Sequence, residues 1–412
     1  MSLGYAEATA NGLSDVPGFT AAGVSCDVRE RGDTRLDLAL IASDRPAVAA
    51  GVFTQHAFAA APVHLCRAVL AGSQAVRGIV ANSGNANACT GPEGDADAEA
   101  MQRLAADALG CVPAEVFVAS TGRIGRRLPM TNVKKGIRAA GKALTAEDED
   151  GLAAADAILT SDTRRKVVTH KIDTPKGPIT LAGMAKGAGM IQPNMATMLA
   201  FLTTDAAIPP ASLQRMLQVA NAASFNRITV DGDMSTNDTL LLLANGASGI
   251  KAGSGPTAKA FQEALTHACQ FLARAIVGDG ERIEHVVDVH VSGAKTAAEA
   301  DNVARAIANS LLVKTSWFGH DPNWGRLLDA AGYAEASMDL EKLTLSYQSA
   351  DGAQTVPAFT QGRAVEKNLA KWKAIVCQRA FAIHLDLGLG KHTATVWTTD
   401  LTTGYVEFNK AE

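Results

Sequence analysis

A threonine near the middle of the sequence, Thr197, stands where a chain can generate its own nucleophile. It follows Ala196 in the stretch Lys186-Gly-Ala-Gly-Met-Ile-Gln-Pro-Asn-Met-Ala-Thr-Met-Leu-Ala-Phe, between a glycine-rich turn and an apolar run. A threonine hydroxyl is a weak nucleophile, but the first residue of a chain carries its own α-amine as the adjacent base. That amine titrates at about 8, so a useful fraction is neutral at pH 7. Cleavage of the Ala196–Thr197 bond is one hypothesis. A turn that enters a buried strand over Met195 to Thr203 is the other.

Three other segments offer the groups that such a threonine needs. The oxyanion of an acyl-transfer intermediate requires backbone donors, and Ala119-Ser-Thr-Gly-Arg-Ile-Gly125 supplies a glycine-containing turn after an apolar run. Lys186 can hold a substrate carboxylate or lower the pKa of a new α-amine, unless it is a solvated surface lysine. Glu281, in Gly-Asp-Gly-Glu, can hold a substrate ammonium, unless it lies in a plain polar turn before a strand at Val286.

Other polar segments favour structural interpretations. The stretch from Ser224 to Thr239 is dense in Asp, Asn and Thr, which is typical of a buried polar network or of capped turns. Its acids Asp231 and Asp233 lack further ligands at a recognised spacing, and the cysteines and histidines are dispersed, so no metal is predicted. The segment Gly136-Ile-Arg-Ala-Ala-Gly-Lys142 has phosphate-loop spacing, but Ala143 replaces the required Ser or Thr and the pattern predicts a helix.

Composition favours an ordinary globular protein. Of 412 residues, 47% are hydrophobic and 19% charged, and the net charge of −4 gives no electrostatic footprint for nucleic acid. No signal peptide is recognised, and no apolar run approaches the roughly 18 residues of a membrane span. The expected compartment is therefore the cytoplasm, with no nucleic-acid or membrane partner.

Short β-rich runs alternate with alanine-rich helical stretches, which predicts an α/β fold. The glycine-rich segment Gly249–Thr257 is the clearest loop and a candidate boundary between two lobes. The elements predicted from periodicity include helices over Asp95–Leu109, Thr257–Val277 and Ala294–Asn309, and strands over Thr229–Val230, Thr239–Ala244, Val286–Ser292 and His392–Thr399.

Several long blocks, in one order along nearly the whole chain, resemble the ornithine acetyltransferase (glutamate N-acetyltransferase) family, whose members include bifunctional arginine biosynthesis proteins. The blocks are the stretch around Thr197, Asn82-Ser-Gly-Asn-Ala-Asn-Ala-Cys-Thr-Gly91, Ser120-Thr-Gly-Arg-Ile-Gly125, Ser224-Phe-Asn-Arg-Ile-Thr-Val-Asp-Gly-Asp233, Ser235-Thr-Asn-Asp-Thr239, Val313-Lys-Thr and Asp321-Pro-Asn-Trp-Gly-Arg326. The resemblance implies an α/β fold, a layered αββα-type sandwich of mixed sheets flanked by helices, in a self-cleaved N-terminal-nucleophile-like enzyme. The implied α chain is residues 1–196 and the implied β chain is residues 197–412.

The resemblance also implies roles for the matching residues. Thr197 is expected to cleave the chain after Ala196 and then to carry the acetyl group. The implied oxyanion hole is Thr121 and Gly122. Amino-acid substrates are expected to contact a set that, besides Thr197, comprises Thr160, Lys186, Glu281 and Asn409.

Three features depart from the family pattern. Glu281 is followed by Arg-Ile-Glu instead of a Gly-Ala-Thr-Lys-like run, and Arg123 replaces a common small apolar residue. The sequence ends at Glu412, before the Ser or Thr that usually closes the family's tail, so a missing or replaced substrate contact is expected.

The implied reaction moves an acetyl group from N²-acetylornithine to glutamate, with no cofactor and with acetyl-coenzyme A as an optional donor. The expected assembly is α2β2. The alternatives are a self-processing aminopeptidase or amidase, in which water accepts the acyl group, and a related acyltransferase of secondary metabolism. A binding protein that stays as one chain is the non-enzymatic alternative.

Overall fold

The computed structural model describes residues 5–7, 12–72, 75–145, 147–192 and 198–410, and these form two compact units. Unit 1 is drawn from Met1–Gly187, Pro193–Asn226 and Met234–Ile276, and unit 2 from Ala188–Gln192, Arg227–Asp233 and Val277–Glu412. The predicted lobe boundary at Gly249–Thr257 is therefore wrong, because this loop lies inside unit 1. A glycine-rich sequence marks a turn, but tertiary contacts decide which elements share a core.

A nine-stranded sheet forms the frame of unit 1, in the order β1-β6-β7-β8-β9-β3-β4-β5, with β2 paired to β3. The strands are β1 (Tyr5–Glu7), β2 (Phe19–Val24), β3 (Leu38–Phe53), β4 (Val76–Asn85), β5 (Val116–Arg123), β6 (Lys166–Thr174), β7 (Gly177–Lys186), β8 (Leu199–Thr204) and β9 (Thr239–Ala244). The long strand β3 belongs to both halves of the sheet. Its first part pairs with β2 and β4, and its last part, from Val48, pairs with β9.

The two halves of this sheet pack face to face. One core cluster contains Ile41 and Phe117 from the β2–β5 half together with Phe201 and Leu241 from the β7–β9 half. A sheet that bends at a long strand can close on itself in this way, because each half then buries its apolar face.

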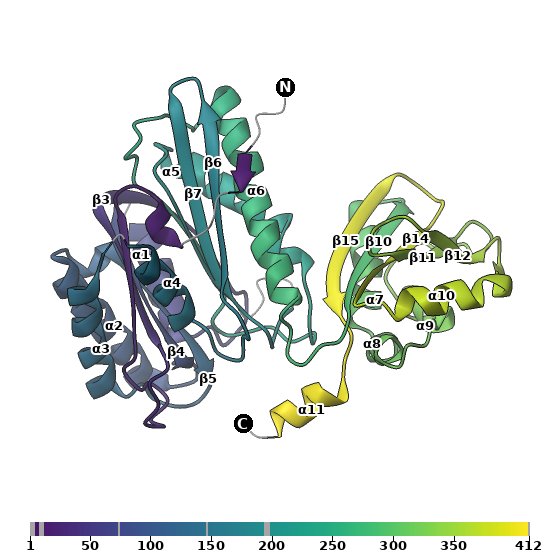
Figure 1. The fold of residues 1–412 in the computed structure, drawn as a ribbon, viewed down its shortest axis with the longest axis horizontal. Coiled ribbons are helices and arrows are strands. Elements are labelled where there is room, and N and C mark those ends of the chain that lie inside the picture. The colour runs from purple at the N-terminus through teal and green to yellow at the C-terminus, as the bar shows by residue number, and fades with distance from the viewer. Residues whose placement is uncertain (1–4, 8–11, 73–74, 146, 193–197, 411–412) are drawn as a thin grey trace. The chain divides into compact units, whose positions relative to one another are not determined.

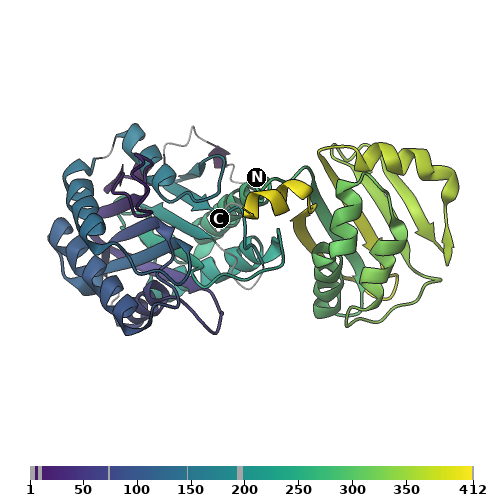
Figure 2. The ribbon, with the colours of Figure 1, turned by 90° about the horizontal axis from the view of Figure 1, so that it is seen from below.

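Helices cover the outer faces of unit 1, as Figures 1 and 2 show. The helices are α1 (Ala61–Gly72), α2 (Gly91–Leu109), α3 (Met130–Ala143), α4 (Asp148–Ala157), α5 (Pro210–Ala222) and α6 (Gly255–Val277). Helices α1 and α4 do not lie on an outer face, because their residues belong to the core cluster that the two halves of the sheet share. Met101 of α2 and Ile137 of α3 share a cluster with Leu40 of β3. On the other half, α5 holds β3 through Gln214, whose amide bonds both the N–H and the carbonyl of Gly51. The predicted αββα sandwich is thus confirmed for this unit.

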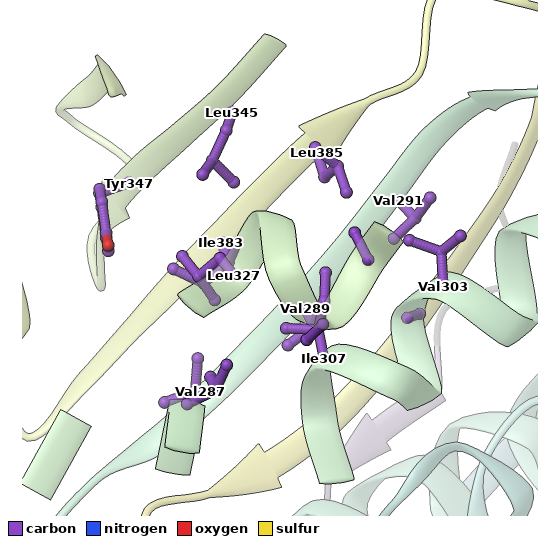
Figure 3. Packing of buried hydrophobic residues seen from close by; sticks show 14 of the residues in the cluster. Val287, Val289, Val291, Val303, Ile307, Leu327, Leu345, Tyr347, Ile383 and Leu385 are labelled. Carbon is purple, nitrogen blue, oxygen red and sulfur yellow. The ribbon is translucent and has the colours of Figure 1, made fainter. Parts of the chain in front are cut away.

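Unit 2 has a six-stranded sheet in the order β13-β12-β11-β14-β10-β15. Its strands are β10 (Val286–Ala294), β11 (Thr344–Ser349), β12 (Thr355–Thr360), β13 (Arg363–Ala364), β14 (Ala380–Asp386) and β15 (His392–Thr399). Its helices are α7 (Ala297–Asn309), α8 (Leu311–Phe318), α9 (Trp324–Gly332), α10 (Leu369–Val376) and α11 (Thr403–Asn409). Figure 3 shows alternate residues of β10, Val287, Val289 and Val291, packing toward Val303 and Ile307 of α7. This period of two places the core on one face of the sheet.

Most of the elements predicted from periodicity are confirmed. Strands β9 and β15 have the predicted bounds, and the phosphate-loop-like segment lies within helix α3. The predicted strand Thr229–Val230 is wrong, because this region contributes only an isolated bridge between Ile228 and Trp397. None of the helices in the described ranges is long and apolar enough to cross a membrane.

The predicted α and β chains do not coincide with the two compact units. Strands β8 and β9 follow Thr197 in the sequence yet belong to unit 1, whereas residues 188–192 precede it and belong to unit 2. Ala196 and Thr197 lie outside the described residues, so cleavage between them stays a prediction. If the bond is cut, each chain contributes residues to both units, and we expect the two chains to remain associated.

Candidate functional site

A buried lysine connects the two layers of unit 1. Lys186 is the last residue of β7 and is only 2% exposed, so the alternative of a solvated surface lysine is wrong. Its Nζ donates to Thr160 Oγ1 at 2.6 Å and to Thr121 Oγ1 at 3.4 Å. Three of the predicted site residues, from β5, β7 and the loop before β6, therefore meet at one ammonium group.

The carboxylate of Asp162 lies beside this lysine and was missed as a site residue in the sequence. Its Oδ2 is 3.8 Å from Lys186 Nζ, and its Oδ1 is 2.7 Å from Lys166 Nζ. Burial alone raises the pKa of Asp162, but the charges of Lys186 and Lys166 outweigh burial and hold that pKa well below its ordinary value. Asp162 is therefore ionised at neutral pH. The sequence signal was its place two residues after Thr160 in Leu-Thr-Ser-Asp.

Thr121 and Gly122, predicted to lie in a turn, lie instead near the end of strand β5, where Gly122 pairs with Gly84 of β4. Gly122 has φ of +134°, and a Cβ there would lie 2.3 Å from the backbone carbon of Gly84. Only glycine combines this backbone conformation with so close an approach. Thr121 is 3% exposed, whereas Gly122 is exposed at the surface of unit 1. The position thus leaves the backbone of Gly122 accessible beside the Thr121 hydroxyl.

We expect Gly122→Ala to displace the end of β5 from β4 and to lower the acetyl-transfer rate by roughly 10²-fold, the size of effect seen when one oxyanion donor is lost. Initial rates and urea unfolding of the purified variant measure the two consequences. Gly125→Ala is the matched control, because Gly125 also has a positive φ (+82°) but no atom would lie within 4 Å of a Cβ at that position. Equal losses in the two variants would contradict the steric argument.

Asn237 and Asp238, the two residues before β9, link the end of β5 to the start of β8. The Asn237 amide donates to the carbonyls of Ala86 and Ser120, at 2.6 and 2.9 Å. The Asp238 carboxyl accepts the Met198 N–H at 3.0 Å. Burial raises the pKa of Asp238 well above its ordinary value. The predicted structural role of this polar stretch agrees with these contacts.

Glu281 and Asn409 form a second group, within unit 2. Asn409 Nδ2, in α11, donates to Glu281 Oε2 at 3.3 Å, and the Glu281 N–H donates to the carbonyl of Ala188 at 3.0 Å. A Cβ on Gly189 would lie 2.5 Å from the Glu281 carboxyl group, so a larger residue there would displace this carboxyl group. Arg282, at the first position where the family pattern is altered, adopts φ of +54°. The turn thus keeps a left-handed conformation without glycine.

Asp231, considered for a metal site in the sequence, instead holds the backbone of residues 190 and 191. Its carboxylate accepts the N–H groups of Met190 and Ile191 at 2.6 and 2.9 Å, and the Tyr405 hydroxyl at 3.2 Å. No group of three or more His, Cys, Asp or Glu side chains suited to a metal ion occurs in the described part of the chain.

A family model, that of the ArgJ family, matches residues 20–411. The chain belongs to the ArgJ family. An ArgJ relative, the arginine biosynthesis bifunctional protein ArgJ of Symbiobacterium thermophilum, is 44% identical over 97% of this chain and 98% of its own. The protein of the same name from Geobacter sulfurreducens is also 44% identical, over 96% and 98%. This confirms the resemblance seen in the sequence.

Among ArgJ-like solved structures is an ornithine acetyltransferase from Mycobacterium tuberculosis in complex with ornithine. It is 37% identical, covers 48% of this chain and all of its own, and aligns with a TM-score of 0.43. The roles of Thr121, Gly122, Thr160, Lys186, Glu281 and Asn409 in this ArgJ-family chain remain predictions for each residue.

Proposed function

We propose that this ArgJ-family chain is a self-processing acetyltransferase, which moves an acetyl group from N²-acetylornithine to glutamate in arginine biosynthesis. The single observation that carries the proposal beyond family membership is the buried cluster of Lys186, Thr160 and Thr121. A lysine ammonium in a low-dielectric site is a strong partner for a carboxylate or a developing oxyanion.

In the proposed reaction, the Thr197 hydroxyl oxygen attacks the acetyl carbonyl carbon and its proton passes to the α-amine. The tetrahedral intermediate places negative charge on the former carbonyl oxygen, for which Thr121 and Gly122 are the proposed donors. Collapse breaks the bond to the ornithine nitrogen, which takes up the proton and leaves. The neutral amine of glutamate then attacks the acetyl ester, and the threonine oxygen recovers its proton.

The same reasoning extends to substrates and partners. Both substrates are amino acids with carboxylates, for which Lys186 and Thr160 are proposed partners, and Glu281 with Asn409 is proposed to bind an ammonium group. No cofactor is proposed, because the acetyl group passes between two amines through an ester, and acetyl-coenzyme A is proposed as an optional donor. We further propose an α2β2 assembly and a cytoplasmic location.

We expect ornithine release from acetylornithine to depend on glutamate, with acetylglutamate formed in equal amount. The test incubates purified protein with acetylornithine, with and without glutamate, and separately with acetyl-coenzyme A and glutamate, and quantifies products by mass spectrometry. Ornithine released at the same rate without glutamate, and no acetylglutamate, would instead identify a hydrolase and overturn the transferase proposal.

A further inference from the structure

We propose that Asp162 is a positioning residue for the acetyl-transfer reaction, and that Lys166 serves as its second counter-charge. This inference rests on the proposed function, since it concerns the same group of residues. It assigns a role to two residues that had none, and it explains how a single lysine is kept both buried and correctly placed.

One carboxylate organises the main chain and the side chains around Lys186. Asp162 Oδ1 accepts the Gly187 N–H at 2.6 Å, and Oδ2 accepts the Thr160 N–H at 3.0 Å. The Asp162 side chain is 0% exposed. The Asp162 carboxylate thus holds two residues that are predicted to bind substrate. It holds Thr160 through the Thr160 N–H, and it holds Lys186 through the Gly187 N–H and through the charge of the Lys186 ammonium.

Lys166 changes the charge balance of this cluster. Its side chain is 1% exposed, and its Nζ is 2.7 Å from Asp162 Oδ1. Two ammonium groups therefore share one carboxylate. With Lys166 bonded directly and Lys186 at 3.8 Å, Asp162 stabilises the Lys186 ammonium without a short ion pair. The Lys186 charge can then act on an anionic group of the substrate.

Three further groups lie near Lys186 in the described part of unit 1. Burial raises the pKa of Asp238 well above its ordinary value, although the Lys186 charge acts in the opposite direction. Arg35 is half-buried and donates to the Thr160 carbonyl at 2.7 Å, so it adds positive charge. The Thr121 hydroxyl is uncharged. Lys166, Lys186 and Arg35 thus place positive charge around the Asp162 carboxylate, and this arrangement favours an anionic substrate group.

The test compares Asp162→Asn, Lys166→Met and the double variant. Asn keeps the size of Asp but removes the charge, so Lys166 and Lys186 both lose the buried carboxylate beside them. We expect kcat/KM of Asp162→Asn to fall by roughly 10²-fold, and the alkaline limb of its pH profile to move to lower pH, because the Lys186 ammonium is less favoured. In Lys166→Met the remaining pair is neutral, so we expect mainly a higher KM.

The double variant separates charge from hydrogen bonding. It removes one negative and one positive charge, so its net charge equals that of the wild type, and we expect it to recover at least about tenfold over Asp162→Asn. A double variant no more active than Asp162→Asn would overturn the proposal, as would an unchanged pH profile in Asp162→Asn. Asp339→Asn is the control, because Asp339 forms an exposed pair with Lys342 at 3.2 Å and should leave kinetics unchanged.

A second measurement keeps this proposal separate from the proposed function. If the wild type makes no acetylglutamate, the proposed function fails on its own. The positioning role is then read from NMR titration of ¹³Cε-labelled lysine, with the Lys186 signal assigned by its loss in Lys186→Met. We expect this signal to titrate at lower pH in Asp162→Asn, and an unchanged midpoint would refute the role of Asp162.

Discussion

Thr197→Ala is expected to leave the chain uncut and to lower acetyl transfer by roughly 10⁴-fold or more, because one hydroxyl is assigned to both reactions. The purified wild type should give two bands of about half the full mass on a denaturing gel, and the variant a single band. Mass spectrometry should place the break between Ala196 and Thr197.

Thr197→Ser is the matched variant, since serine keeps the hydroxyl and the α-amine. It should still cut itself, although more slowly, and retain measurable transfer. A wild-type chain that stays intact on the gel, with the same band pattern in Thr197→Ala, would refute self-processing and favour a binding protein. Cleavage that persists in Thr197→Ala would assign the reaction to another residue.

Lys186→Met is expected to lower kcat/KM for acetylornithine by roughly 10²- to 10³-fold. Truncating one partner of a buried, hydrogen-bonded charge pair removes its interactions and leaves the remaining polar groups buried without that ammonium group. Thr160 Oγ1 and Asp162 would lose their ammonium neighbour, and Lys166 would remain as the counter-charge of Asp162. Steady-state kinetics with both substrates, together with thermal unfolding, would separate a lost contact from a lost fold.

Lys251→Met is the control for removal of a lysine charge, because Lys251 is exposed. Its kinetics should match the wild type. Lys186→Arg should rescue little, since a planar guanidinium does not fit a site built around the compact Lys186 ammonium. A kcat/KM for Lys186→Met within threefold of the wild type would exclude Lys186 from substrate binding.

Local patterns in the sequence were sufficient for many of the regular elements and for the family. The period of two in β10 and the runs that became β9 and β15 depend mainly on neighbours in sequence, so they are visible without a fold. The long blocks in one order were specific enough to indicate the ArgJ family, and the residue types at Thr121, Lys186 and Thr197 indicated acyl transfer.

Only the tertiary structure could decide which polar residues meet. In the sequence, nothing connects the charges of Lys166, Asp162 and Lys186. In the structure they form one buried cluster, because β6 pairs with β7 and the loop before β6 lies beside both lysines. Likewise, the glycine-rich loop Gly249–Thr257 looked like a domain boundary, whereas the chain passes from one unit to the other at different positions. The physical reason is that burial, charge compensation and core membership depend on contacts between residues distant in the chain, which no local pattern encodes.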